Sequence, residues 1–182
     1  MKNSILDTYE SLLEKSLSIP ALVTLASKKD AKFLSEFDSW LKETEALLEK
    51  NRMAQCSEIA GLRSKIINAR FDKNIVATKR RKHVWSVATE IVYDAQHTLL
   101  AVLEPIKHRL DEARDAISQL LGVAYQANMI NREINFNDMI QELWKIFSTH
   151  EQLKGLVGKI LVYVNKTDAL RILADEIELL KD

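Results

Sequence analysis

The fold class is decided by residues 84–124, which read VWSVATEIVYDAQHTLLAVLEPIKHRLDEARDAISQLLGVA. Twelve apolar residues of this stretch follow one another at steps of three or four, which places them on one face of an α-helix. They are Val84, Ala88, Ile91, Ala95, Leu99, Val102, Ile106, Leu110, Ala113, Ile117, Leu120 and Ala124. The phase is the same on both sides of Pro105, so we predict one helix over residues 83–129, kinked near that proline.

Residues that form turns are scarce in the rest of the chain. The 182 residues include 4 glycines and 2 prolines, well below the usual ~7% and ~5%. Sheet proteins need such residues at every reversal, whereas long helices do not. We therefore predict an all-α fold, an elongated helical bundle of coiled-coil-like character with about five to seven helices in total. We expect a single helical domain over residues 1–182, or a long-helix bundle over 30–130 with a smaller C-terminal helical subdomain over 136–182.

The chain begins with a helical pattern over residues 5–17, and Ser4 stands three residues before Asp7 as a capping residue. We expect this helix to end near Ser18. Proline is favoured at the first position of a helix, where its missing N–H would have no partner in any case. Pro20 therefore predicts the start of a second, short helix.

A second stripe of apolar side chains at helical spacing runs over residues 33–48, with Asp30 as its expected N-cap. The stripe weakens beyond Asn51 and resumes over residues 59–69. Two interpretations fit this pattern. Residues 30–78 form either one helix with a skip in its repeat or two helices broken near Ser57.

Three asparagines within residues 131–137 favour a chain reversal at the end of the long helix. The remainder predicts three shorter helices over residues 136–147, 153–164 and 170–180, the last capped by Thr167. The middle segment is rich in β-branched residues and contains two glycines, so its sequence also permits a strand.

The net charge of zero conceals one basic segment. Residues 59–83 carry eight basic side chains and one acidic side chain. The candidate polyanion-binding residues are Arg63, Lys65, Arg70, Lys73, Lys79, Arg80, Arg81, Lys82 and His83. In a functional interpretation they bind phosphates of nucleic acid or of an anionic surface, and Phe71 and Trp85 stack on bases.

A structural interpretation of the basic segment is simpler. The charges then flank an ordinary core face or pair with acidic residues elsewhere in the chain, and Phe71 and Trp85 are core residues. No single helical face holds all eight charges, whereas a helix that reads a nucleic-acid groove presents a cleaner face. We therefore favour the structural interpretation and keep polyanion binding as the alternative.

Motifs that carry chemistry are missing from the sequence. It has no glycine-rich phosphate loop, no His-Glu-x-x-His zinc motif and no Gly-x-Ser-x-Gly nucleophile turn. Glu104 and His108 share a helix face but lack the further carboxylates of a helical metal site. Cys56 is the single cysteine and has no histidine beside it in sequence. We expect no enzymatic activity, no cofactor and no metal.

The function predicted from these features is a helical protein–protein interaction module, of the adaptor, chaperone or effector kind. It would act through apolar helix faces and either self-associate as an oligomer or dock another protein, with nucleic acid as the alternative partner. The first residues lack the apolar run of a signal peptide, and no apolar run approaches the ~20 residues that span a bilayer. We therefore expect no membrane span, and a location in the cytoplasm or export by a signal-independent route.

Overall fold

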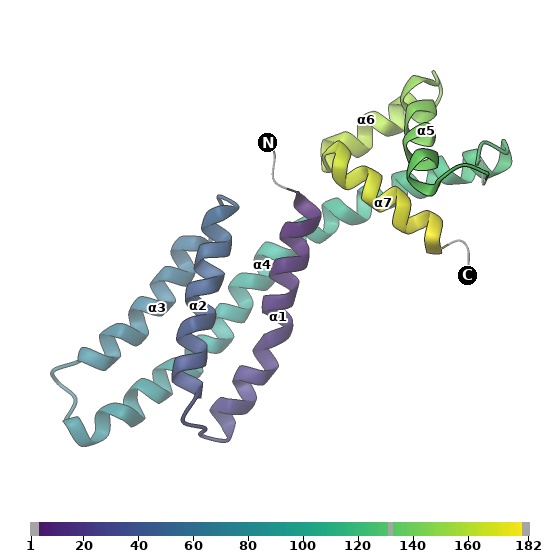
Figure 1. Cartoon of the computed structure of the whole chain (residues 1–182). Helices are drawn as coiled ribbons and strands as arrows, with labels where there is room; N and C mark the ends of the chain where they lie inside the picture. Colours follow the sequence, from purple (N-terminus) through teal and green to yellow (C-terminus); the bar gives the residue numbers. More distant parts are fainter. Residues whose placement is uncertain (1–3, 131–132, 180–182) are drawn as a thin grey trace. The chain divides into compact units, whose positions relative to one another are not determined.

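The computed structural model of the chain describes residues 4–130 and 133–179. Within these residues the chain forms seven α-helices and no strand, so the predicted all-α class and helix number are confirmed (Figure 1). The helices are α1 (Ile5–Ser27), α2 (Phe33–Lys50), α3 (Cys56–Phe71), α4 (Ala77–Gln126), α5 (Phe136–Thr149), α6 (Lys154–Tyr163) and α7 (Lys166–Leu179). In these ranges, no helix combines the length and the apolarity that crossing a bilayer requires.

Helix α4 runs without interruption through Pro105, as predicted. It starts at Ala77, six residues before the expected start at His83, so the basic residues that follow Thr78 lie inside the helix and not at a junction before it. All twelve residues of the apolar stripe are buried, none more than 7% exposed. This burial on both sides of the proline offsets the backbone hydrogen bond that Pro105 cannot donate. The kink itself stays a prediction.

Helix α1 also continues through a proline, and the predicted break near Ser18 is wrong. Ile19 and Leu22, on either side of Pro20, are both buried, while Pro20 itself is exposed. Continuing the helix therefore keeps one core face intact at the cost of a single hydrogen bond. Leu17, which the sequence pattern placed on the apolar face, is 71% exposed.

The region from residue 30 to residue 78 contains two helices, α2 and α3, which resolves the alternative that the sequence left open. They are separated at residues 51–55, where Arg52 adopts a left-handed conformation with φ of 55° and the N–H of Met53 donates to the carbonyl of Leu48 over 3.0 Å. The N-cap of α2 is Lys32 and not Asp30. The Asp30 carboxylate instead accepts a 2.9 Å hydrogen bond from the N–H of Lys32, the residue just before the first residue of α2.

The three short C-terminal helices are confirmed, and the middle one, α6, is a helix rather than a strand. Asn135 caps α5 by accepting a hydrogen bond from the Asn137 N–H. The cap of α7 is Asn165 and not Thr167, because the side-chain oxygen of Asn165 accepts from the Asp168 N–H over 2.9 Å. Asn131 and Leu180, which belonged to the predicted reversal and to the last helix, lie outside the described residues.

The chain divides into two compact units. The N-terminal unit comprises Thr8–Glu104, and the C-terminal unit comprises Met1–Asp7 with Pro105–Asp182. Both boundaries fall inside helices, within the first turns of α1 and at the proline of α4. The division predicted from the sequence, into residues 30–130 and 136–182, stays a prediction.

The N-terminal unit is a bundle of α1, α2, α3 and the first half of α4 (Figure 1). The indole N–H of Trp40 donates to the Ser18 hydroxyl over 2.9 Å and so joins α2 to α1. The ring of Phe33 stacks on Phe37 and lies 4.9 Å from the ring of Trp85, which joins α2 to α4. Aromatic packing of this kind dominates the energetics of small cores.

The C-terminal unit packs α5, α6 and α7 with the second half of α4. Lys159 of α6 lies 3.1 Å from Glu112 of α4 in an ion pair. Arg109 of α4 donates a 2.6 Å hydrogen bond to the carbonyl of Tyr163, at the end of α6. The first turn of α1 belongs to this unit as well.

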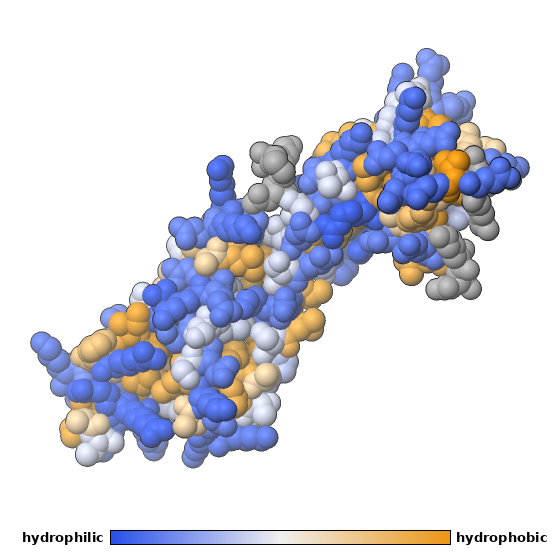
Figure 2. Space-filling view, viewed as in Figure 1, coloured by the Kyte–Doolittle hydropathy of each residue, from blue (hydrophilic) through white to orange (hydrophobic). Residues whose placement is uncertain are grey.

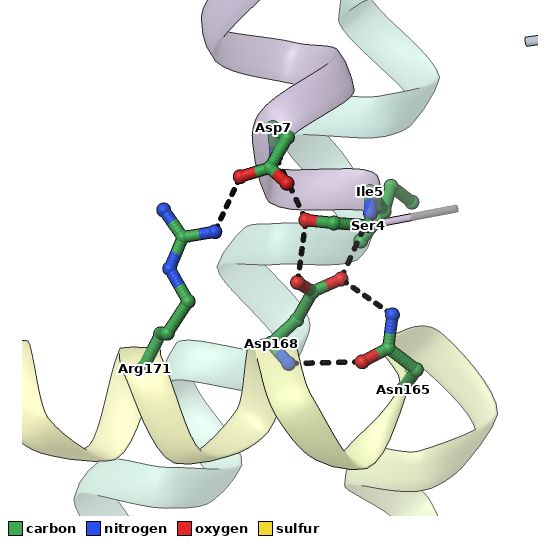
Figure 3. Close-up of polar contacts among 6 residues, drawn as sticks. All are labelled: Ser4, Ile5, Asp7, Asn165, Asp168 and Arg171. Carbon is green, nitrogen blue, oxygen red and sulfur yellow. Dashed lines mark hydrogen bonds and ion pairs between the residues drawn. The ribbon is translucent and has the colours of Figure 1, made fainter. Parts of the chain in front are cut away.

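Asp168, in the first turn of α7, holds that turn of α1 in place (Figure 3). Its carboxylate is completely buried and accepts hydrogen bonds from the Ser4 hydroxyl (2.6 Å), the Ile5 N–H (2.8 Å) and the Asn165 amide (2.9 Å). Ser4 in turn accepts from the Asp7 N–H, so the predicted capping role of Ser4 is confirmed. A buried carboxylate with this many donors is satisfied, and its role is structural.

Candidate functional site

The nine residues of the candidate polyanion site all lie in the N-terminal unit. They are distributed over α3 from its middle onward, the connection between α3 and α4, and the first two turns of α4. Arg63, Arg80 and His83 are half-buried, and the other six are exposed: Lys65, Arg70, Lys73, Lys79, Arg81 and Lys82.

Two of the arginines have structural roles. The guanidinium of Arg63 lies 2.5 Å from the carboxylate of Glu45 and joins α3 to α2. Arg80 donates to the carbonyls of Asp72 and Ile75, at 3.3 Å and 3.2 Å, and so holds the connection between α3 and α4 against the start of α4. Both guanidinium groups thus make contacts within the N-terminal unit.

The six exposed cations are different. Within the described residues, none of them has an acidic partner within ion-pair distance. Pairing inside the bundle, one of the two roles in the structural interpretation, therefore applies to Arg63 and not to this group.

The start of α4 is an electrostatically unfavourable place for cations. A helix N-terminus carries a partial positive charge, and α4 has no acidic residue in its first turn. Each cation there costs a few tenths of a kcal/mol, up to about 1 kcal/mol, when no anion is nearby. The cations of the segment Lys79–Lys82 thus do not contribute to the stability of α4 through the helix dipole.

A groove of about 860 Å³ lies between the end of α1 and the first half of α4. It is lined by Val23, Ala26, Ser27, Lys29, Thr78, Arg81, Lys82, Trp85, Ser86, Thr89, Glu90, Val92 and Tyr93. We call it the α1–α4 groove. From Thr78 to Tyr93 the helix rises about 22 Å, at ~1.5 Å per residue, so the groove follows about four turns.

The composition of the α1–α4 groove is amphipathic. Ala26 and Val92 are buried at its floor, and the half-buried Trp85 adds an aromatic edge. Exposed cations stand at its rim, namely Lys29, Arg81 and Lys82, against one exposed carboxylate, Glu90. Tyr93, also on the rim, is 57% exposed. Such a groove offers apolar surface for binding and positive charge for orientation.

The second notable surface is the turn between α3 and α4. Phe71 was expected in the core, and this expectation is wrong, because the residue is 75% exposed. Val76 is 66% exposed in the same connection. We call the set Arg70, Phe71, Lys73, Val76 and Lys79 the α3–α4 tip. Figure 2 shows hydrophobic and hydrophilic residues mixed at this end of the N-terminal unit, at the far left of the view.

Trp85 packs inside the bundle, as the structural interpretation predicted. Its ring packs against Phe33, at 4.9 Å between centroids, and is half-buried. Phe71 could have been recognised from the sequence, because it is out of phase with the buried stripe of Ile59, Leu62, Ile66 and Ala69. The α1–α4 groove could not have been recognised from the sequence, because its two walls are about 50 residues apart and no local pattern brings them together.

Groups suited to metal or nucleophilic chemistry do not converge in the described parts of the chain. No three His, Cys, Asp or Glu side chains in these ranges are placed to hold a metal ion. Glu104 and His108 are both exposed on α4. The pKa of Cys56 is raised by its desolvation and by the nearby carboxylates of Glu49 and Glu45, which keeps the thiol protonated and weakly nucleophilic.

The α1–α4 groove and the α3–α4 tip are therefore the two candidate binding surfaces of the N-terminal unit. Both combine apolar side chains with cations that have no acidic partner in the described residues. No protein-family model matches the sequence, and no curated protein and no solved structure matches the chain.

Proposed function

We propose that the chain is a protein-binding module whose α1–α4 groove takes an amphipathic, acidic helix from a partner protein. The observation that carries the proposal is an open groove with an apolar floor and three cations, Lys29, Arg81 and Lys82, on its rim. An amphipathic helix in a hydrophobic groove is a recurrent mode of peptide recognition, with anchors at positions i, i+3 or i+4, and i+7.

The dimensions of the groove support this occupant. About four turns of α4 line it, and a partner helix of about 15 residues has the same length at ~1.5 Å per residue. A helix that lies between α1 and α4 places its apolar side chains on Ala26, Trp85 and Val92. This burial supplies the free energy of binding, at about 25 cal/mol per Å² of apolar surface.

Charge complementarity supports an acidic partner. The rim has three cations and one carboxylate, Glu90, and its cations have no acidic partner in the described residues. Acidic residues along the edges of the incoming helix would pair with Arg81 and Lys82 and fix its direction. A basic helix would be repelled, so the rim determines specificity more than affinity.

The long apolar stripe of α4 does not support association. All of its residues are buried by the chain itself, so the surface expected to bind a partner is already used inside the fold. The groove replaces it as the docking surface in this proposal.

A peptide selection tests the proposal. A display library of 18-residue helices, with random residues on all faces, is panned against the whole chain. Selected peptides should carry an apolar stripe flanked by Asp and Glu. Their affinity should fall by at least about tenfold when Arg81 and Lys82 are replaced by glutamate, and again with Val23→Asp, at a half-buried residue that lines the groove.

The matched control is the double variant Lys65→Glu with Arg70→Glu, which makes the same change of charge outside the groove. It should leave the affinity unchanged within about twofold. Equal losses in the groove variant and the control would show a general charge effect and contradict docking in the groove. Selection of basic or non-helical peptides would also contradict the proposal.

Self-association is tested on the same variants. If light scattering shows a dimer and Val23→Asp makes it a monomer, the partner is a second copy of this chain. A dimer that persists in the groove variants would place the contact elsewhere.

A further inference from the structure

We propose that the α3–α4 tip binds an anionic lipid surface, with Phe71 and Val76 entering the interface and Arg70, Lys73 and Lys79 meeting the headgroup phosphates. This inference does not rest on the function proposed above, because the tip and the α1–α4 groove share no residue.

The apolar residues of the tip are exposed and do not belong to the hydrophobic core. Phe71 ends α3 and is 75% exposed, and Val76 precedes α4 and is 66% exposed. Four residues separate Phe71, the last residue of α3, from Val76, the last residue before α4, so both stand at the turn between these two helices. Apolar side chains at a helix–helix turn are well placed to enter a membrane interface to a shallow depth.

The cations of the tip surround these apolar residues. Arg70, Lys73 and Lys79 are exposed and have no ion pair within the described residues. Within residues 70–79 the one acidic residue is Asp72, and its side chain accepts a 2.8 Å hydrogen bond from the Asn74 N–H inside the turn. Basic residues beside apolar ones match the headgroup and acyl layers of an anionic leaflet.

The connection that presents the tip is ordered by its own hydrogen bonds. The guanidinium of Arg80 donates to the carbonyls of Asp72 and Ile75, and Asp72 closes its turn on Asn74. The backbone between Phe71 and Val76 is therefore held in place before binding. Less conformational entropy is lost when such a surface binds.

Lipid fits this surface better than single-stranded nucleic acid. Nucleic-acid binding without sequence preference requires several aromatic side chains on which bases stack. Phe71 is the one exposed aromatic residue of the tip, since the ring of Trp85 packs against Phe33. Val76 is aliphatic and offers nothing to a base, but it is well suited to an acyl layer.

The test is sedimentation of the full chain with vesicles. Vesicles of phosphatidylcholine alone should not bind the chain, whereas vesicles that also contain phosphatidylserine should. Lys73→Glu with Lys79→Glu should weaken binding on the order of 30-fold or more, from two lost attractions to the leaflet. Phe71→Ser with Val76→Ser should weaken it about tenfold or more. Rising salt should weaken the binding of the wild type.

Leu17→Ser is the matched control, because Leu17 is 71% exposed on α1 and has no role in the tip. It should bind as the wild type does. Circular dichroism of each variant checks that the helices are intact. If a tip variant fails to fold, the chain with Cys56→Ser and Val76→Cys, labelled with an environment-sensitive dye at position 76, reports insertion by a blue shift with phosphatidylserine vesicles.

Three results would overturn the inference. The first is no binding to phosphatidylserine vesicles at low salt. The second is binding that the tip variants leave unchanged, with no blue shift of the dye. The third is tight binding of a thymidine oligonucleotide that phosphatidylserine vesicles do not compete away, which would assign the tip to nucleic acid.

Discussion

The hydroxyl of Ser4 donates a 2.6 Å hydrogen bond to the buried carboxylate of Asp168, although the two residues are 164 positions apart. The same carboxylate accepts from the N–H of Ile5, so one side chain of α7 caps the start of α1 (Figure 3). The positive end of α1 thereby faces a negative charge, which stabilises a helix N-terminus. Asp168 thus joins the first turn of α1 to α7 within the C-terminal unit.

Replacement of Asp168 by alanine should destabilise the protein by about 3 kcal/mol, because several buried donors lose their acceptor at once. Urea unfolding followed by circular dichroism measures this loss. Asp175→Asn, an exposed change on the same helix, should stay within about 0.5 kcal/mol of the wild type. An equally small effect of Asp168→Ala would show that the network contributes little.

Thr44 is completely buried in α2, and its hydroxyl has no hydrogen-bond partner among the residues that the structure describes. Thr44→Val keeps the shape and removes a desolvated polar group, so it should stabilise the fold by about 1 kcal/mol. Thermal unfolding should show a higher Tm. Thr98→Val is the comparison, since the buried hydroxyl of Thr98 lies 3.4 Å from a carboxylate oxygen of Glu58. It should give no gain, and a lower Tm for Thr44→Val would contradict the prediction.

The stability of the C-terminal unit should depend on pH through two ion pairs. The Arg171 guanidinium, hydrogen-bonded to Asp7, lowers the pKa of that carboxyl below its ordinary value of 3.8. Lys159 lowers the pKa of Glu112 below its ordinary value of 4.5. A lowered pKa in the folded state means that the contribution is present above the ordinary value and is lost as the pH falls through the lowered one.

The ion pair between Glu112 and Lys159 should also limit stability at alkaline pH. Glu112 raises the pKa of Lys159 above its ordinary value of 10.5, so this contribution is present below that value and is lost as the pH rises through the raised one. The free energy of unfolding, measured by denaturation across pH, should fall both in acid and in base. Arg171→Gln should lower stability at neutral pH and lose its difference from the wild type in acid. Lys65→Gln, at an exposed cation that has no ion pair in the described part of the chain, should show no such dependence.

Cys56 should react slowly with iodoacetamide in the folded protein, because desolvation and two nearby carboxylates raise the pKa of its thiol. Mass spectrometry at mildly alkaline pH compares the folded chain with the chain in urea. Glu49→Gln removes one of the carboxylates and should speed the reaction. Faster alkylation in the folded state would show an activated thiol and contradict the account.

The sequence predicted those parts of the fold that depend on local pattern. The stripe of α4 was read correctly through Pro105, and Asn135 and Ser4 cap helices as their residue types favour. Pro20 was misread, because whether a proline ends a helix depends on which residues around it are buried, here Ile19 and Leu22. That burial is set by the neighbouring helices and not by local spacing.

Prediction of the candidate sites succeeded less well, for the same reason. The basic segment was recognisable from charge alone, but only the structure separates Arg63 and Arg80, which have partners within the chain, from the exposed cations. The α1–α4 groove depends on α1 lying beside α4, and the side chains at its floor look like ordinary core residues in the sequence.

A photo-crosslink from the α1–α4 groove tests most directly whether a partner helix docks there. Benzoylphenylalanine at position 93 replaces Tyr93 on the rim, and in a control chain it replaces Leu17, which is exposed outside the groove. On illumination with a selected acidic helical peptide, a crosslink is expected from position 93 and none from position 17. Equal crosslinking from both positions, or from position 17 alone, would contradict docking in the groove.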